Sequence, residues 1–328
     1  MRILIIGGTR FVGRHIAEAA LAAGHDLTLL HRGKSKPDVL TDAEHLLADR
    51  DGDLSILDGR SFDATVDVCA YWPRQVRSLA GALGDRGGQH VYISSVSAYR
   101  DTDRPGGDES IPLATLDPGA DPDDIEMSET TYGPLKALCE QAAVDAYGAD
   151  RVTIVRPSYV VGPYDPTGRF TWWVDRIARG GPVLCPGPAD SPMQLIDARD
   201  QGAWVVRLVE SGTTGAFHSC SPEPPWSFAD MVDAIAETLD AKIEPVWVGG
   251  PALRAEGVDG GDLPLWSEGA DEQVLALDAS AARASGLTPR PVAETIRDTA
   301  QWMASASWQR EGSGLDPERE DDLRARLG

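Results

Sequence analysis

Short apolar runs rich in β-branched residues alternate with helical patterns through the first 160 residues of the chain. The apolar runs lie at Arg2–Ile6, Leu27–Leu30, His45–Ala48, Ala64–Cys69, His90–Ile93 and Val152–Val155. The helical patterns lie at Val12–Ala23, Pro73–Leu83 and Tyr132–Tyr147. This alternation predicts parallel strands joined by right-handed helical crossovers. We therefore expect an α/β fold, a doubly wound parallel sheet with helices on both faces.

The pattern loosens after residue 157, where Gly and Pro cluster and eight of the nine Trp lie beyond position 170. This change predicts a first domain at 1–157 with returning segments near 193–219, a smaller C-terminal lobe at 158–192 and 220–310, and a charged tail at 311–328. The strand-helix unit of Gln194–Ile196 and Gln201–Val209 is expected to return to the first sheet, as is Ala216–His218.

Two charged segments stand outside this alternation. The stretch Ser97–Thr131 is acidic, contains several Pro and Gly, and has no period. A loop of that length is usually functional or mobile, so we expect either a lid over the site or a disordered insert. In the tail, the spacings Glu320/Arg324 and Asp322/Arg326 are typical of a solvated helix.

Composition and charge narrow the class of protein. The chain has 328 residues, of which 42% are hydrophobic and 25% charged, and a net charge of -22. The composition is globular, and strong acidity disfavours nucleic acid and anionic membranes as partners. There is neither a long apolar run nor a signal peptide, and the four Cys form no CxxC pair or Cys/His cluster. We expect a cytoplasmic protein with reduced thiols, no metal site and no membrane segment.

A glycine-rich string follows the first predicted strand and opens a helix. The string is GGTRFVG, with Gly7 and Gly13 at the first and last glycine positions of a dinucleotide fingerprint and Arg10 in place of the middle glycine. Such a turn lets the helix N-terminus direct free N–H groups at a pyrophosphate. The strand-loop-helix context favours a Rossmann-type dinucleotide-binding domain over a purely structural turn with a surface Arg.

The end of the second strand bears on the choice of cofactor. It reads His31-Arg32, where an NAD-selective site usually carries a carboxylate. Arg10 and Arg32 can pair with a 2′-phosphate, so we expect NADP rather than NAD; a simply solvated Arg32 is the alternative. Asp49 is a candidate partner for the adenine amine. The expected cofactor contacts are Gly7, Thr9, Arg10, Phe11, Val12, Gly13, His31, Arg32, Asp49, Arg50, Ala70, Lys136 and Pro157.

Tyr132 and Lys136 stand at i and i+4, one above the other on a helix face. An ammonium near a phenol lowers the pKa of the phenol, which makes Tyr132 a usable proton donor and acceptor. Ser95 ends the apolar strand VYISS, at the edge of the sheet where ligands bind in such folds. A lone YxxxK string arises by chance; together with Ser95 and the glycine turn it predicts a catalytic site.

These motifs resemble the extended short-chain dehydrogenases/reductases, also called the NAD-dependent epimerase/dehydratase family. The resemblance covers roughly residues 1–305 and rests on GGTRFVG, SSVSAY, YGPLK, RPSYVVGP and LIDARD. The chain is most similar to an atypical branch with Arg in the glycine loop, which includes the chloroplast stem-loop-binding proteins. The resemblance implies a Ser95–Tyr132–Lys136 triad. Tyr132 would move the proton, Lys136 would hold the nicotinamide ribose and Ser95 would bond the substrate carbonyl oxygen.

Departures from the family pattern narrow the chemistry. Val96 and Ser97 replace the Asp-Glu pair of the sugar-nucleotide dehydratases, so water elimination lacks its acid and base. Tyr159 replaces an Asn and Met193 replaces an Arg that the family's sugar-nucleotide enzymes carry. A nucleotide-sugar substrate is therefore disfavoured, although another Arg, such as Arg169 or Arg176, can substitute.

The smaller lobe, which we expect to bind the substrate, is rich in aromatic residues. Tyr159, Trp172, Trp173 and Met193 are the predicted substrate contacts, with Phe170 and Trp226 nearby; their alternative role is packing. His218 is expected to pack or bond locally. Related proteins pair the helices Pro73–Leu83 and Tyr132–Tyr147 into a dimer contact, so a homodimer is expected.

The predicted function is NADP-dependent reduction of a carbonyl, or oxidation of an alcohol, on a small uncharged or aromatic molecule. One alternative is a sugar or sugar-nucleotide epimerase that retains NAD(P). Another is a non-catalytic regulatory protein that binds NADP or RNA. Net turnover of the cofactor distinguishes the first two, because an epimerase consumes none.

Overall fold

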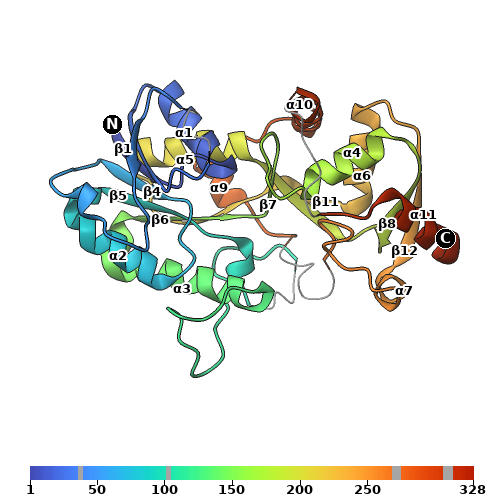
Figure 1. Ribbon diagram of the computed structural model, residues 1–328, viewed down its shortest axis with the longest axis horizontal. Helices are drawn as coiled ribbons and strands as arrows, with labels where there is room; N and C mark the ends of the chain where they lie inside the picture. Colours follow the sequence, from blue (N-terminus) through green and yellow to red (C-terminus); the bar gives the residue numbers. More distant parts are fainter. Residues whose placement is uncertain (36–39, 101–104, 268–274, 306–312) are drawn as a thin grey trace. The chain divides into compact units, whose positions relative to one another are not determined.

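The computed structural model describes residues 1–35, 40–100, 105–267, 275–305 and 313–328. The chain forms two compact units (Figure 1). Unit 1 comprises Met1–Ser158, Ala198–Cys220 and Leu277–Thr288, and unit 2 comprises Tyr159–Asp197, Ser221–Ala276 and Pro289–Gly328. The segment Leu277–Thr288 thus belongs to unit 1, although it falls within the predicted second lobe.

Unit 1 is built on a seven-stranded parallel sheet in the order β10-β6-β5-β4-β1-β2-β3. Its strands are β1 (Arg2–Ile6), β2 (Asp26–His31), β3 (Glu44–Leu47), β4 (Ala64–Asp67), β5 (Gln89–Ile93), β6 (Val152–Pro157) and β10 (Gly215–Ser219). The inner strands are nearly continuous apolar runs because helices cover both faces of a parallel sheet. The predicted doubly wound α/β fold is confirmed.

Helices α1 (Phe11–Ala22) and α5 (Ala198–Ser211) cover one face of this sheet, and α2 (Pro73–Leu83) and α3 (Glu129–Tyr147) cover the other (Figure 1). Gly202 allows α5 to approach α1 closely, since a Cβ there would lie 2.7 Å from the His15 carbonyl carbon. The shorter helices of unit 1 are η1 (Ser55–Leu57), η2 (Gly84–Gly87), η3 (Val96–Ala98), η4 (Ala149–Arg151) and α9 (Ser280–Ala284).

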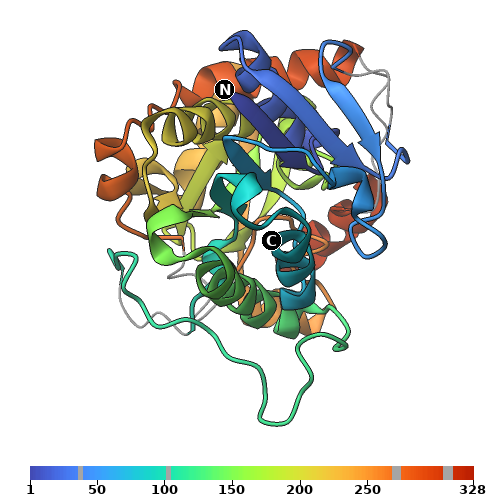
Figure 2. The ribbon, with the colours of Figure 1, turned by 90° about the vertical axis from the view of Figure 1, so that its left-hand side faces the viewer.

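The acidic segment between η3 and α3 runs as a long loop beside α3 (Figure 2). Its residues 101–104 lie outside the described residues. The indole N–H of Trp72 donates to the carbonyl oxygen of Ile125 at 3.0 Å, and the amide of Asp278 donates to Gly107 at 3.0 Å. Asp123 binds the backbone amide of Arg74 at 2.9 Å. The described part is therefore anchored to unit 1, which favours a structured loop over a disordered insert; the lid remains a prediction.

Unit 2 contains two small sheets and five helices among its described residues. The three-stranded sheet has the order β11-β9-β7 and the two-stranded sheet pairs β12 with β8. The strands are β7 (Tyr159–Val161), β8 (Gly181–Gly187), β9 (Pro192–Asp197), β11 (Ser221–Ser227) and β12 (Ile243–Gly249). The helices are α4 (Arg169–Ala178), α6 (Phe228–Thr238), α7 (Gly250–Ala255), α10 (Val292–Ser305) and α11 (Pro317–Leu327).

The expectation that Gln194–Ile196 returns to the first sheet is wrong. Strand β9 pairs with β7 and β11 in unit 2, whereas α5 and β10 do lie in unit 1. A strand pattern specifies a conformation and its two faces, but the pairing partner is decided by contacts far along the chain.

The charged tail is docked on unit 2, which contradicts the expected solvated helix. Glu320 of α11 is only 2% exposed; one carboxylate oxygen accepts from the Arg176 guanidinium and the other from the amide of Leu184 at 3.0 Å. Asp322 and Arg326 do form the exposed i,i+4 pair, at 2.8 Å. Residues 311–312 of the predicted tail lie outside the described part. Local spacing identified the helix and left its tertiary contacts undetermined.

Candidate functional site

The glycine turn after β1 is shaped to admit a phosphate group. Gly7 has φ +92, and a Cβ there would lie 2.9 Å from the Cys69 sulfur; a Cβ on Gly13 would lie 2.5 Å from the Gly7 carbonyl oxygen. Helix α1 has no side-chain cap and no acidic residue in its first turn, so its leading N–H groups are not satisfied by side chains. A close backbone turn with open amides fits the pyrophosphate of a dinucleotide.

Both ring nitrogens of His31, at the end of β2, form hydrogen bonds within the protein. Its Nδ1 accepts from the Gly33 amide at 3.0 Å, and its Nε2 lies 2.8 Å from Nδ1 of His45, whose Nε2 lies 3.1 Å from the Leu40 carbonyl oxygen. Because Nδ1 accepts, the proton is assigned to Nε2 and the ring is neutral. Burial, and then His45, lowers the pKa of His31. The expected cofactor contact by His31 therefore has no free ring nitrogen with which to form.

Other expected contacts remain available around the same turn. Arg10 and Arg32 are both exposed. The hydroxyls of Thr9 and Ser35 lie 2.6 Å apart and are hydrogen-bonded, which ties the glycine turn to the loop after β2. Phe11 and Val12 begin α1, and Pro157 ends β6. Their contacts with a cofactor stay predictions.

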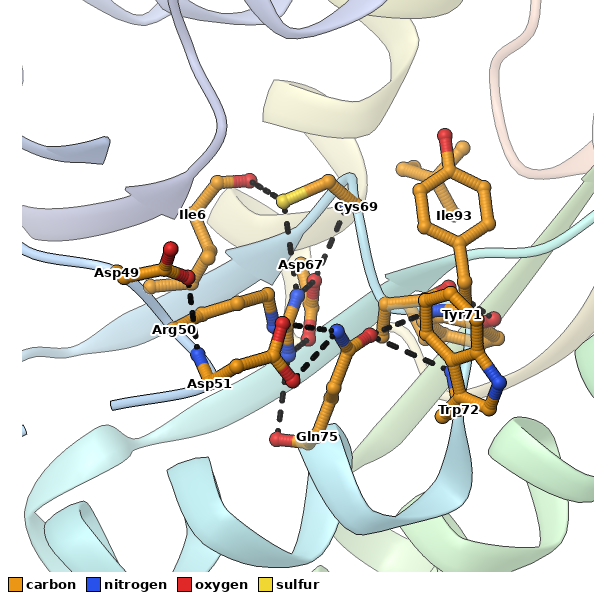
Figure 3. Close-up of polar contacts among 12 residues, drawn as sticks. Ile6, Asp49, Arg50, Asp51, Asp67, Cys69, Tyr71, Trp72, Gln75 and Ile93 are labelled. Carbon is orange, nitrogen blue, oxygen red and sulfur yellow. Dashed lines mark hydrogen bonds and ion pairs between the residues drawn. The ribbon is translucent and has the colours of Figure 1, made fainter. Parts of the chain in front are cut away.

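Arg50 is a buried structural cation (Figure 3). Its guanidinium donates to both carboxylate oxygens of Asp67, at 2.6 and 2.8 Å, and to the Gln75 carbonyl oxygen at 3.2 Å. Burial alone would raise the pKa of Asp67, but Arg50 lowers it, so the pair stays charged. The guanidinium thus joins the segment after β3 to the end of β4, and the expected cofactor contact by Arg50 stays a prediction. Asp49, two residues beyond β3, is exposed and open to an adenine contact.

Lys136 lies beneath the carboxyl ends of β4 and β5. Its side chain is 2% exposed, and Nζ donates to the carbonyl oxygens of Ile93 at 2.6 Å and Ala70 at 3.2 Å. Nζ also lies 4.3 Å from the ring centroid of Tyr92 and 5.4 Å from that of Tyr71. Burial lowers the pKa of Lys136 to about 8, so the ammonium form still predominates at neutral pH.

Ser95 and Tyr132 come from two elements that approach each other closely. Ser95 caps η3, where its oxygen accepts from the Ser97 amide at 3.1 Å. Tyr132 lies in the first turn of α3, and Gly133 follows it. A Cβ on Gly133 would lie 2.1 Å from the Ser97 carbonyl oxygen, so glycine is what allows the helix to contact the Ser95 turn.

A buried ion pair holds α3 against the same strand ends. Arg156 donates to both carboxylate oxygens of Glu140, at 3.0 and 2.6 Å, and Ser94 donates to Glu140 as well. Arg156 also donates to the hydroxyl of Tyr99 at 2.6 Å, just beyond η3. One face of α3 carries residues at four-residue intervals, the predicted triad members Tyr132 and Lys136 and then the anchoring Glu140. His218, bonded to Tyr99 and to the Asp278 carbonyl oxygen, packs locally as expected.

Three of the four predicted substrate contacts lie in the core of unit 2. Trp172 and Trp173 are fully buried and their indole N–H groups donate to the carbonyl oxygens of Leu315 and Pro264. Met193 is 1% exposed. These side chains offer no surface to a substrate, so the packing alternative holds for them. Tyr159 is half-buried, with the Arg169 guanidinium 5.1 Å from its ring centroid.

The sequence interpretation missed two residues of this edge, Tyr71 and Gly133. Tyr71 lies four residues after the carboxyl end of β4, at the same edge of the sheet as Ser95 after β5. Gly133 was hidden inside the YGPLK string and shows its importance only through the distance to Ser97. Among the described residues, no group of three or more His, Cys, Asp and Glu is placed to hold a metal ion. No described helix is long and apolar enough to cross a membrane.

The parallel sheet, the glycine turn and the edge around Lys136 define a Rossmann-type α/β protein of the dinucleotide-binding class. The family model for the NAD dependent epimerase/dehydratase family matches residues 3–86 and 73–218. The chain therefore belongs to that family, which confirms the resemblance to the extended short-chain dehydrogenases/reductases.

Individual relatives are distant. The chain is 26% identical over 215 residues to the chloroplast stem-loop binding protein of 41 kDa b of Arabidopsis thaliana, with 61% of this chain and 52% of that protein covered. It thus spans about half the length of this curated relative. A Burkholderia cenocepacia protein assigned to the epimerases has a TM-score of 0.70 at 22% identity, covering 93% of this chain and 98% of the other. UDP-glucose 4-epimerase of Thermus thermophilus, solved with NAD, has a TM-score of 0.66 at 19% identity, covering 93% and 100%. Both structures support the fold alone.

Proposed function

We propose that the protein is an NADP-dependent oxidoreductase that reduces a carbonyl, or oxidises an alcohol, through Ser95, Tyr132 and Lys136. The observation that carries this proposal is the buried ammonium of Lys136, one helical turn after Tyr132, bonded to the carbonyl oxygens of Ala70 and Ile93. Lys136 is desolvated and forms no ion pair with the described carboxylates. A cation of this kind, at the carboxyl edge of a dinucleotide-binding sheet, is typical of a catalytic site.

The chain's own residues divide the work of the reaction. The cofactor, when bound, supplies or accepts the hydride. Ser95 donates a hydrogen bond to the substrate oxygen, and Tyr132 delivers the proton to that oxygen or removes it in the reverse direction. Lys136 favours charge on the Tyr132 oxygen electrostatically, and its third N–H is left for the cofactor ribose. Gly7, Gly13 and the start of α1 hold the pyrophosphate.

The preference for NADP rests on two exposed cations, one in the glycine turn and one directly after β2. Arg10 and Arg32 remain as partners for a 2′-phosphate, and no carboxylate ends β2. Charge-assisted contacts to one phosphate should favour NADP by on the order of 1–3 kcal/mol. Calorimetric titration with NADP and NAD tests this preference, and equal or tighter binding of NAD would exclude it. Arg32→Ala should remove most of the difference, whereas Arg60→Ala, which removes a half-exposed arginine, should leave it intact.

The arrangement of the guanidinium groups in unit 2 favours a small, uncharged substrate over one that carries a diphosphate. Arg176 pairs with Glu320 and is only 6% exposed, so it is not available to a diphosphate. Arg169 is held near the Tyr159 ring by Thr167, to whose hydroxyl it donates at 3.2 Å, and is the one guanidinium of the predicted pair that can still meet an anion. Reduced-nicotinamide absorbance against a panel of ketones and aldehydes tests the reaction class. Activity with UDP-sugars and no net cofactor turnover would instead identify an epimerase, the activity named for the Thermus relative.

RNA binding is the second alternative, because the curated plant relative is named for binding a stem-loop. The net charge of -22 weighs against it, since phosphate backbones are bound mainly through Lys and Arg. A gel-shift series with stem-loop RNA at low salt decides the matter: binding that weakens steeply with salt would support this role in place of catalysis.

A homodimer through α2 and α3 is part of the proposal. A cavity of about 330 Å³ lies along these two helices, lined mainly by apolar atoms of Pro73, Pro122, Leu138, Ala142 and Ala146. An open apolar groove between helices suits burial against a second copy. Light scattering at micromolar concentration tests this, and a monomer mass would refute it.

A further inference from the structure

Two tyrosine rings flank the ammonium of Lys136, and their hydroxyls are used differently. Tyr92 is fully buried and donates to the Ala70 carbonyl oxygen at 3.0 Å, the same oxygen that accepts from Lys136. Tyr71 is half-buried, and its hydroxyl forms no hydrogen bond with the described residues. Tyr92 is therefore part of the frame, whereas Tyr71 presents a phenol with unused hydrogen-bonding capacity.

The backbone of Tyr71 is fixed on both sides. Its amide donates to the side-chain oxygen of Gln75 at 2.8 Å, and the Gln75 amide group donates to Asp51 at 2.9 Å. On the other side, the Ala70 carbonyl oxygen accepts from Lys136 at 3.2 Å. In Figure 3 the Tyr71 ring stands away from the Arg50–Asp67 pair, with no contact drawn to its hydroxyl. A phenol on so rigid a support is suited to holding a ligand in place.

Tyr71 lies between the glycine turn, where the cofactor is expected, and the predicted catalytic residue Lys136. Cys69, two residues earlier, contacts the Gly7 turn of the cofactor site. Lys136 of the triad lies 5.4 Å from the Tyr71 ring centroid. Burial, and then Tyr132, raises the pKa of Tyr71 to about 12, so its hydroxyl stays protonated and acts as a donor throughout the working range of pH.

We propose that Tyr71 is a substrate-binding residue whose hydroxyl donates a hydrogen bond to an acceptor oxygen next to the reacting carbon. The site then selects ketones and aldehydes with an oxygen on the neighbouring carbon, such as α-alkoxy or α-hydroxy ketones. This inference rests on the proposed function and deepens it. It needs no proton transfer from Tyr71, because Tyr132 remains the proton donor and acceptor.

The test compares two ketones that differ in one group. Methoxyacetone and 2-pentanone have the same chain length, with an ether oxygen in the first where the second has a methylene. Wild-type protein with NADPH should favour methoxyacetone about 3- to 10-fold in kcat/KM, the range of one neutral hydrogen bond. Tyr71→Phe keeps the ring and its contact with Lys136, and should bring the ratio close to one, mainly by raising KM for methoxyacetone.

Tyr147→Phe is the matched control. Its buried hydroxyl also has no partner among the described residues, but Tyr147 ends α3, roughly 22 Å along the helix from Tyr132. This variant should keep the wild-type ratio. A ratio unchanged in Tyr71→Phe, or an equal loss on both ketones, would overturn the inference and leave Tyr71 a structural or cofactor-contacting residue.

A binding measurement separates this inference from the proposed reaction. NADP⁺ and a ketone cannot react together, so calorimetry on the protein–NADP⁺ complex gives the affinity for each ketone without turnover. The same 3- to 10-fold preference, lost in Tyr71→Phe, supports the inference even where no ketone is reduced. If wild-type protein binds both ketones equally, the inference is wrong whatever the outcome of the activity panel.

Discussion

Unit 1 buries a cation at the sheet edge around Lys136, and unit 2 buries one at the contact between α4 and α11. The two cations differ in the groups that surround them. In unit 2 the guanidinium of Arg176 is paired with Glu320. In unit 1 the ammonium of Lys136 is just as deeply buried, but it rests on two carbonyl oxygens and two aromatic rings, with no ion pair among the described residues. Among the described residues, the other buried arginines, Arg50 and Arg156, follow the pattern of Arg176, with Asp67 and Glu140 as partners.

The difference teaches how to distinguish a structural cation from a functional one. Burying a charge without a counter-charge costs desolvation free energy, and packing contacts do not offset that cost. The paired arginines can be explained by the fold alone, because each one neutralises a buried carboxylate. Removing either partner would leave the other charge buried and unpaired. Lys136 cannot be explained in this way, and its lowered pKa records the cost. An unpaired buried cation at the carboxyl edge of the sheet fits the catalytic role that we propose for Lys136.

The largest expected effect is the loss of the Tyr132 hydroxyl, the proton donor of the proposed mechanism. Tyr132→Phe should lower turnover on a verified substrate by about 10²–10⁴-fold, the usual contribution of a positioned acid. Cofactor affinity and the free energy of unfolding should change little, because the ring is retained. Steady-state kinetics with calorimetric titration of NADP checks both, with Tyr147→Phe as control. Near-full activity in Tyr132→Phe would place the proton donor elsewhere and refute the mechanism.

The paired cation of unit 2 should show the opposite behaviour. Glu320→Ala leaves Arg176 buried and unpaired, so the free energy of unfolding should fall by about 3–5 kcal/mol. Tryptophan fluorescence during urea unfolding reports mainly on unit 2, because only Trp72 and Trp204 lie in unit 1. Asp175→Ala, which breaks the half-exposed pair with Arg179, is the control and should cost about 0–1 kcal/mol. An equal, small loss in both variants would contradict the contrast between the units.

Much of the secondary structure of unit 1 could be predicted from local sequence patterns. All six strands expected in the first 160 residues exist, and α2 spans Pro73–Leu83 as predicted. The periods of strands and helices are local, as are the strand-loop-helix order of the glycine turn and the four-residue spacing of Tyr132 and Lys136. Such features are recognisable in a single sequence because each depends on residues that are neighbours along the chain.

The errors share one cause, a partner supplied by another element of the fold. The Nε2 of His31 is occupied because His45 lies opposite it on the neighbouring strand β3. Trp173 is core because it meets the Pro264 carbonyl oxygen, 91 residues away. Glu320 is buried because Arg176 is 144 residues distant in sequence and adjacent in space. Composition and spacing identified each residue type as chemically interesting, but the contact that decides its role is tertiary.

The close approach at Gly133 offers a smaller, geometric test of the triad edge. Gly133→Ala places a methyl group against the Ser97 carbonyl oxygen and should push the Ser95 turn away from Tyr132. Misplacement of reacting groups by about 1 Å can cost up to 10²-fold, so kcat should fall about 10- to 100-fold. Gly81→Ala on α2, where a Cβ meets nothing within 4 Å, should be slightly stabilising with unchanged kcat. Equal kinetics in the two variants would show that the Ser95 turn tolerates the shift.

The smallest expected effect is the pH dependence of stability that an unpaired buried lysine must produce. The pKa of Lys136 is about 8 in the folded protein, below its ordinary value of 10.5, so between these values the unfolded chain binds more protons than the folded one. Stability contributed by this group therefore rises as pH increases through that window. Relative to Lys136→Met, wild-type protein should gain on the order of 1 kcal/mol between pH 7 and pH 9. Urea unfolding of both proteins at the two pH values measures this difference, and Gly81→Ala should track the wild type at both. A difference that stays constant with pH would show that Lys136 keeps its ordinary proton affinity, and the distinction between the paired and the unpaired cation would lose its electrostatic basis.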